Sequence, residues 1–312
     1  MAFILALMGA VSTASGTPTP SGVASDAGAG EVSAFVSEAQ AVVFTVGALG
    51  LVWVVGFSGL CRRGGLDRRG SREVSALPAL AWFFVAVTVF YVQFFAGALV
   101  SGVFDIGAIE ETLGGVKVSS VVGGGAALVT SLVAVGFLVV LHKAAPRAGM
   151  SWRWKEAGVG ALSMALVFPI VASVGALAAV IAAMLGAASG STIAHDTLEV
   201  IASGRDNPWA WGLVFAVVVG VPIVEEVIYR VGVQSAVRRL TGSAWASVLL
   251  TSALFSAMHW SIIPAGSRHQ LAALFALSVA MGAVFEWRRS IAASIAMHGV
   301  FNLVNVALAV AG

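Results

Sequence analysis

Long apolar stretches separated by short polar segments dominate the pattern of this chain. Each stretch is about as long as the 20 helical residues that cross the hydrocarbon core of a bilayer. Because a backbone in lipid must satisfy its own hydrogen bonds, such stretches form helices. The pattern predicts an all-α, polytopic transmembrane helical bundle of about eight spans, near residues 41–60, 76–103, 118–141, 157–187, 209–237, 243–263, 270–287 and 291–311.

The composition supports this interpretation and excludes a soluble protein. Of the 312 residues, 59% are hydrophobic and only 10% are Asp, Glu, Lys or Arg, against about 25% in soluble domains. The net charge is only +2, and the arginines cluster between spans. We therefore expect membrane lipid as a partner, and no nucleic acid.

Basic residues are distributed unevenly between the two sides of the predicted bundle. Fourteen of the 17 Lys and Arg residues follow or end the first, third, fifth and seventh spans, whereas acidic residues favour the alternate loops. The positive-inside rule then places both termini outside. The Ala-, Gly- and Val-rich, Lys-poor composition favours a bacterial source, so we expect the bacterial cytoplasmic membrane.

The sequence predicts three regions. Residues 1–39 form a flexible segment rich in small residues. Within it, residues 1–15 are a candidate signal peptide, although no Lys or Arg precedes the apolar run. Residues 40–154 hold the N-terminal transmembrane helices, and residues 155–312 hold a domain that carries the polar residues described next.

Ionisable residues inside the predicted spans are concentrated in the last third of the chain. Charged groups at such depth are costly, so they mark candidate functional sites. The set, with one asparagine added, is Glu225, Glu226, Arg230, His259, His298 and Asn302.

The two adjacent carboxylates have different neighbours. Glu226 and Arg230 are four residues apart, so they share a helix face and can form an ion pair. Glu225 is rotated by about 100° from Glu226 and points elsewhere. One carboxylate can thus be held by the arginine while the other is free for chemistry.

The same four-residue interval recurs on two later spans. Phe255 and His259 share a face of the sixth span, and His298 and Asn302 share a face of the eighth. The positions of these residues within their spans put them at a similar depth, so three helices can direct them at one cavity.

Two mechanisms fit these groups. In the first, a desolvated glutamate is the general base for a water that one His orients, while the other His and the Asn amide stabilise an oxyanion. This set hydrolyses an amide without a cofactor. In the second, Glu225, His259 and His298 hold zinc with water as the fourth ligand.

The three motifs together resemble those of a known family. This is the CAAX-processing and bacteriocin-processing (CPBP, or Abi) family of intramembrane proteases, whose pattern is EExxxR, FxxxH and HxxxN. The three motifs stand in this order at residues 225–230, 255–259 and 298–302. The resemblance covers about residues 155–311, so the C-terminal domain is predicted to be a CPBP-like intramembrane protease domain.

The resemblance implies a mechanism and a residue for each role. It implies an eight-helix fold with a site open toward the cytosol, and a CAAX prenyl protease 2-like endopeptidase. Glu225 would activate water together with His259. His298 and Asn302 would stabilise the oxyanion.

The resemblance also implies supporting residues and a substrate class. Arg230 would have a structural role beside Glu226, and we expect Phe255 to line the cavity or pack beneath it. The substrate would be a peptide or protein, lipidated in the branch that trims prenylated CAAX proteins. We expect no cofactor, with zinc as the alternative.

Other functions fit parts of the pattern. A non-catalytic membrane scaffold or immunity protein of the same family needs no free glutamate. A proton-coupled transporter also uses intramembrane Glu and His, but the chain has no internal repeat of the kind that such transporters contain. The charged residues could also be only a structural ion cluster.

Overall fold

The structure is a computed structural model that describes residues 41–62, 64–70, 72–103, 118–186, 196–204 and 206–311. Every regular element in these ranges is a helix. The predicted flexible segment 1–39, with the candidate signal peptide at 1–15, lies outside the described residues.

The helices are described in chain order, with η marking π-helical or 3-10 segments. The first is Ala41–Phe57, whose last turn is η1. The elements are η1 (Trp53–Phe57), α3 (Gly65–Gly70), α4 (Ala79–Val103), α6 (Val118–Ala144), α7 (Trp154–Met184), α8 (Asp196–Ser203), α9 (Pro208–Phe215), η2 (Ala216–Gly220), α10 (Val221–Glu226), η3 (Val227–Gln234), α11 (Ser235–Thr241), α12 (Ala244–Met258), η4 (Ala265–Ser267), α13 (Gln270–Arg288) and α14 (Ile291–Ala311).

Six of the described helices are long and apolar enough to cross a membrane. They comprise α4, α6, α7, the continuous helix Pro208–Thr241, α13 and α14. Two shorter apolar helices, Ala41–Phe57 and Ala244–Met258, stand where the first and sixth spans were expected. The structure therefore confirms the polytopic helical bundle, with a helix at each expected span.

The sixth expected span is shorter than the sequence indicates. It was expected to run to residue 263, but α12 ends at Met258 and a turn follows. A helix of 15 residues is about 22 Å long, which is less than the hydrocarbon core of about 30 Å. His259 therefore follows a helix that stops inside the bundle.

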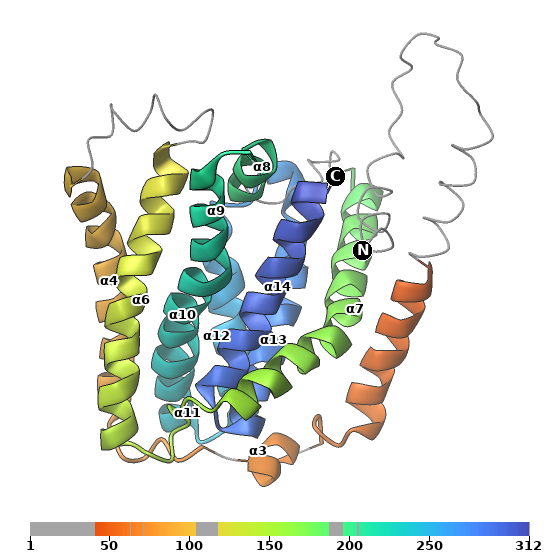
Figure 1. The fold of residues 1–312 in the computed structure, drawn as a ribbon. Helices are drawn as coiled ribbons and strands as arrows, with labels where there is room; N and C mark the ends of the chain where they lie inside the picture. The colour runs from red at the N-terminus through yellow and green to blue at the C-terminus, as the bar shows by residue number, and fades with distance from the viewer. Residues whose placement is uncertain are drawn as a thin grey trace.

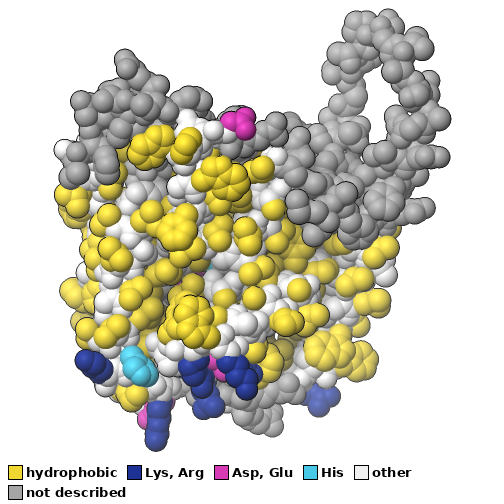
Figure 2. Space-filling model, viewed as in Figure 1, with side chains coloured by type: hydrophobic (Ala, Val, Ile, Leu, Met, Phe, Trp, Pro, Cys, Tyr) yellow, Lys and Arg dark blue, Asp and Glu magenta, His cyan; other side chains and the backbone are white. Residues whose placement is uncertain are grey.

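The helices stand side by side between two ends of the molecule (Figure 1). α3 and α11 lie at one end, and α8 lies at the other. On the face in Figure 2, Lys and Arg gather at the α3 end, and apolar side chains cover the surface above them. This distribution matches the charge asymmetry of the sequence.

Glycines let several helices approach closely. A Cβ added at Gly160 of α7 would lie 1.9 Å from the carbonyl oxygen of Ala293 in α14. A Cβ at Gly232 of η3 would lie 2.5 Å from the Cβ of Ala86 in α4. Small residues at such crossings are typical of packed membrane helices. These contacts fix α14 and η3, which carry most of the candidate site.

The long helix 208–241 contains two π-helical segments, η2 and η3. Pro222 follows η2 by two residues and has no backbone N–H. The carbonyl of Val218, four residues earlier, therefore lacks its α-helical partner, which accounts for the irregular turn. The second segment, η3, begins directly after Glu226. Such segments often occur at functional sites.

Candidate active site

Glu226 lies at the centre of the candidate site. Its side chain is fully buried, and its Oε2 accepts a hydrogen bond of 3.0 Å from the Nε of Arg230. The hydroxyl of Ser294 donates to the same oxygen. The Nδ1 of His298 is 3.1 Å from Oε1. Both carboxylate oxygens are thus occupied, so Glu226 is held in place by its three partners.

Glu225 lies beside it in a different environment. Its side chain is 24% exposed, and its Oε2 is 3.7 Å from the Nε2 of His298. That distance is too long for a hydrogen bond. The imidazole of His298 therefore stands between the two carboxylates, with Nδ1 toward Glu226 and Nε2 toward Glu225. One carboxylate is fixed and its neighbour is open, as the helical spacing predicts.

Arg230 is fully buried and connects Glu226 to a neighbouring helix. Its Nη2 donates a 2.9 Å hydrogen bond to the hydroxyl of Ser278 on α13. Its guanidinium carbon is 5.7 Å from the ring centroid of Phe255. These contacts orient the side chain whose charge Glu226 balances.

His259 and Phe255 form the α12 side of the site. The Nδ1 of His259 is 2.7 Å from the carbonyl oxygen of Phe255. Since a carbonyl only accepts, Nδ1 carries the hydrogen, and in the neutral ring Nε2 is an acceptor. The ring of Phe255 is 4.6 Å from that of His259 and 6.2 Å from that of His298. Phe255 therefore packs against both imidazoles.

Asn302 connects α14 to the π-helical segment η2. Its Nδ2 donates a 2.8 Å hydrogen bond to the carbonyl of Val217 in η2. Because an amide has two N–H groups, this bond leaves one for another acceptor. The approach depends on Gly299, where a Cβ would lie 2.9 Å from the carbonyl oxygen of Val218.

The structure thus brings most of the expected residues into contact. Glu226 with Arg230, and His298 with both carboxylates, form one connected group. Phe255 connects His259 to this group through ring contacts. The chemical roles of these residues stay predictions.

The site also contains two residues that the motifs did not include. Ser294 donates a hydrogen bond to Glu226, and Ser278 accepts one from Arg230. Ser294 has a sequence signal, because it precedes His298 by four residues and so shares its helix face. Ser278 has none, since only the packing of α13 against η3 brings it to Arg230.

The zinc alternative would use Glu225, His259 and His298 as ligands. Within the described ranges, no group of three or more His, Cys, Asp and Glu side chains could hold a metal ion. We derive no step through a metal.

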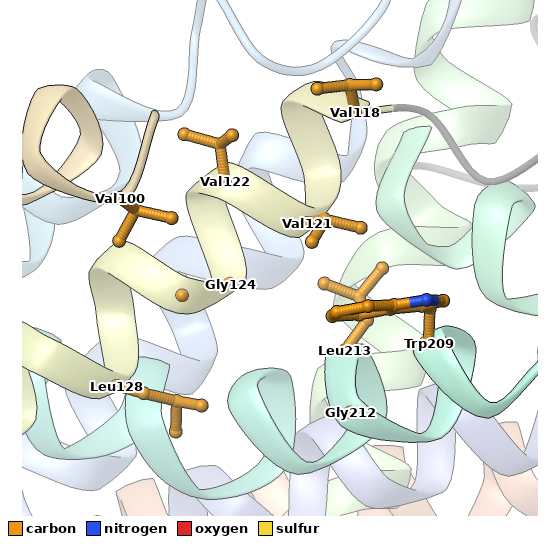
Figure 3. A pocket seen from close by; sticks show the side chains of 10 residues that line it. Val100, Val118, Val121, Val122, Gly124, Leu128, Trp209, Gly212 and Leu213 are labelled. Carbon is orange, nitrogen blue, oxygen red and sulfur yellow. The ribbon is translucent and has the colours of Figure 1, made fainter. Parts of the chain in front are cut away.

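A separate hollow lies on the opposite half of the bundle from the basic end. It has a volume of about 170 Å³ and lies between α4, α6 and α9. Val100, Val121, Leu128, Trp209 and Leu213 are among the residues that line it (Figure 3). None of the candidate site residues lines this hollow, so it carries none of the proposed chemistry.

Comparison with protein families finds a match over the segment that contains the site. Residues 207–304 match the family model described as type II CAAX prenyl endopeptidase, Rce1-like. No curated protein and no solved structure matches the chain. The match includes all three motifs and confirms the resemblance that they carry. With the apolar helices, it makes the chain an integral membrane protein.

Proposed function

Because residues 207–304 match the model of the Rce1-like type II CAAX prenyl endopeptidase family, we propose that this protein is an intramembrane endopeptidase. Its substrate would be a membrane-associated peptide or the C-terminal segment of a protein, with lipidated substrates included. It would act in the bacterial cytoplasmic membrane, with both termini outside.

The separation of two adjacent carboxylates carries this proposal. Glu226 has every oxygen occupied by Arg230, Ser294 or His298. Glu225 is partly exposed and 3.7 Å from an imidazole nitrogen. A purely structural ion cluster needs only the first of these groups. A second, accessible carboxylate next to it is what a general base requires.

The proposed reaction uses one water and forms no covalent bond between the enzyme and the substrate. Glu225 takes a proton from water while the water oxygen attacks the carbonyl carbon of the substrate. His259, whose Nε2 is an acceptor, orients that water. When the tetrahedral intermediate collapses, the C–N bond breaks and Glu225 gives its proton to the leaving amine. The products are a carboxylic acid and an amine, which exchange a proton to become a carboxylate and an ammonium group.

The developing oxyanion needs hydrogen-bond donors in a dry site. The remaining N–H of Asn302 supplies one. In the proposed reaction the His298 ring carries a hydrogen on each nitrogen, so that Nδ1 faces the carboxylate of Glu226 and Nε2 supplies the second donor. Arg230 and Ser294 act only through Glu226, as positioning residues.

The test compares wild type with Glu225→Gln in reconstituted vesicles. The peptide library contains prenylated and unprenylated members, and each assay runs with and without a chelator. Loss of the base should lower cleavage by at least about 10²-fold. Thermal unfolding should change little, since the Glu225 side chain is partly exposed. The matched control is Glu73→Gln, at an exposed carboxylate paired with Arg147, which should leave cleavage unchanged.

Each outcome has a definite meaning. Cleavage that is absent in Glu225→Gln and survives the chelator supports the metal-free reaction. Loss of wild-type cleavage in the chelator supports the zinc alternative. A wild type that cleaves no peptide, while Glu225→Gln still binds a partner or protects cells, supports the non-catalytic scaffold.

A further inference from the structure

A row of buried polar side chains leads from Glu226 toward the basic end of the bundle. On η3 and the turn before it, Glu226, Arg230 and Gln234 follow one another at four-residue intervals. On α13 the facing positions repeat this interval. We define the polar seam as Arg230, Gln234, Ser278, Gly282, Glu286 and Arg72.

Gln234 connects η3 to α13. Its Nε2 donates to the carbonyl of Gly282 at 3.2 Å and to Oε1 of Glu286 at 2.9 Å. Two acceptors around one nitrogen fix the orientation of the amide. A Cβ added at Gly282 would lie 2.9 Å from Oε1 of Gln234. A larger residue at position 282 would therefore push the Gln234 amide out of this orientation.

Arg72 closes the seam from a distant part of the sequence. Its Nη2 is 2.7 Å from Oε1 of Glu286, and neither side chain is exposed. Its Nη1 donates 3.0 Å hydrogen bonds to the carbonyl of Ala148 and the hydroxyl of Ser235. The guanidinium carbon lies 3.8 Å from the centroid of the Phe285 ring. Arg72 is thus held from four directions.

The seam is poorly explained by stability alone. Replacing a buried ion pair with well-packed apolar side chains is often neutral or stabilising. Three buried atoms of the seam also have no hydrogen-bond partner among the described residues: Nη1 of Arg230, Oε1 of Gln234 and Oε2 of Glu286. Unpartnered buried polar atoms cost free energy. What the seam supplies instead is a fixed direction for each side chain.

We propose that Gln234 and the Arg72–Glu286 pair are positioning residues for the active site. They hold η3 in one register against α13 and so fix the direction in which Arg230 meets Glu226. This inference rests on the proposed peptidase function.

The position of η3 along α13 has to be fixed because η3 is irregular. A π-helical turn is an irregular alternative to the α-helical turn, and η3 begins directly after Glu226. A return to α-helical turns would rotate Arg230 relative to Glu226. The hydrogen bonds of Arg230 to Ser278 in the middle of the segment, and of Gln234 to α13 at its end, oppose that rotation.

The test variant is Gln234→Met, which keeps the length of the side chain and the Arg72–Glu286 pair. The matched control is Arg288→Met, which breaks a different ion pair of α13, with Glu156 on α7. We measure kcat and KM in vesicles. We also record the ¹⁵N signals of the His298 ring, assigned by their loss in His298→Gln. These signals report the contact between His298 and Glu226.

We expect Gln234→Met to lower kcat by about tenfold or more, because small misplacements of catalytic groups are costly. KM should change little and the His298 signals should shift. Arg288→Met should change neither. A Gln234→Met protein with wild-type kcat and unshifted His298 signals overturns the inference. If Gln234→Met fails to fold, the double variant Arg72→Met/Glu286→Leu, which leaves no unpaired charge, decides by the same measurements.

The two proposals fail in different ways. A wild type without peptidase activity refutes the proposed function, and the His298 signals then decide alone whether the seam positions the site. A wild type that cleaves while both seam variants keep their kcat and His298 signals refutes only the seam.

Discussion

At the scale of single residues, the candidate site contains two glutamates that are adjacent in the sequence. Glu226 has three partners, whereas the adjacent Glu225 faces the Nε2 of His298 at 3.7 Å and makes no hydrogen bond within the described part of the chain. The partners of Glu226 make it costly to remove, since Arg230 would remain as a buried unpaired charge. Glu225 makes no such contact, so its substitution reports on chemistry.

Asn302 offers the sharpest test of the oxyanion role. We expect Asn302→Ala to lower kcat by about 10²–10³-fold, the usual cost of one oxyanion donor. KM should change little, because the donor acts in the transition state. The control is Asn305→Ala, since Asn305 lies one turn further along α14 and donates only to the carbonyl of Phe301. Steady-state kinetics of both variants check this, and an Asn302→Ala enzyme with unchanged kcat contradicts the role.

At the scale of helices, the site depends on where backbones cross. α14 carries Ser294, His298 and Asn302, and α7 packs against it through Gly160. Asn302 donates a hydrogen bond to η2, and Gly299 lets the two helices approach closely enough for this bond. The positions of the histidine and the amide therefore follow from helix packing and not from their own sequence neighbours.

Gly160→Ala tests this dependence. The added methyl group would lie 1.9 Å from the carbonyl oxygen of Ala293, so α14 must move. We expect a loss of stability of about 1–3 kcal/mol and reduced peptidase activity. Gly158→Ala is the matched control on the same helix, because a Cβ there meets no atom within 4 Å. Thermal unfolding in detergent gives the comparison; equal midpoints for the two variants would contradict the close crossing.

At the scale of the whole molecule, the charge distribution predicts an orientation in the membrane. The basic end carries ion pairs that connect distant segments, such as Arg238 with Asp67 and Arg288 with Glu156. Arg72, which the sequence indicates only as one of several loop arginines, is buried in this end with Glu286. The N-terminal helices are therefore tied to the domain that carries the site.

Cys61 provides a direct test of the orientation. It is the one cysteine of the chain, and it is exposed beside Arg62. If the basic end faces the cytosol, a membrane-impermeant maleimide should label Cys61 in inverted vesicles but not in intact cells. Labelling after detergent solubilisation controls for reactivity. Labelling in intact cells would place the basic end outside.

The sequence by itself determined the helical bundle, the helix positions and the pairing of Glu226 with Arg230. These follow from apolar length and four-residue spacing, which are local properties of the chain. The domain boundaries before residues 40 and 155 stay a prediction.

Only the tertiary structure decided the rest. It ended α12 at Met258, turned one His298 nitrogen to each glutamate, and brought Ser278, Glu286 and Arg72 to η3. These contacts join residues up to 214 positions apart. Spacing within one helix carries no information about which helix lies opposite, because that depends on how all the helices pack together.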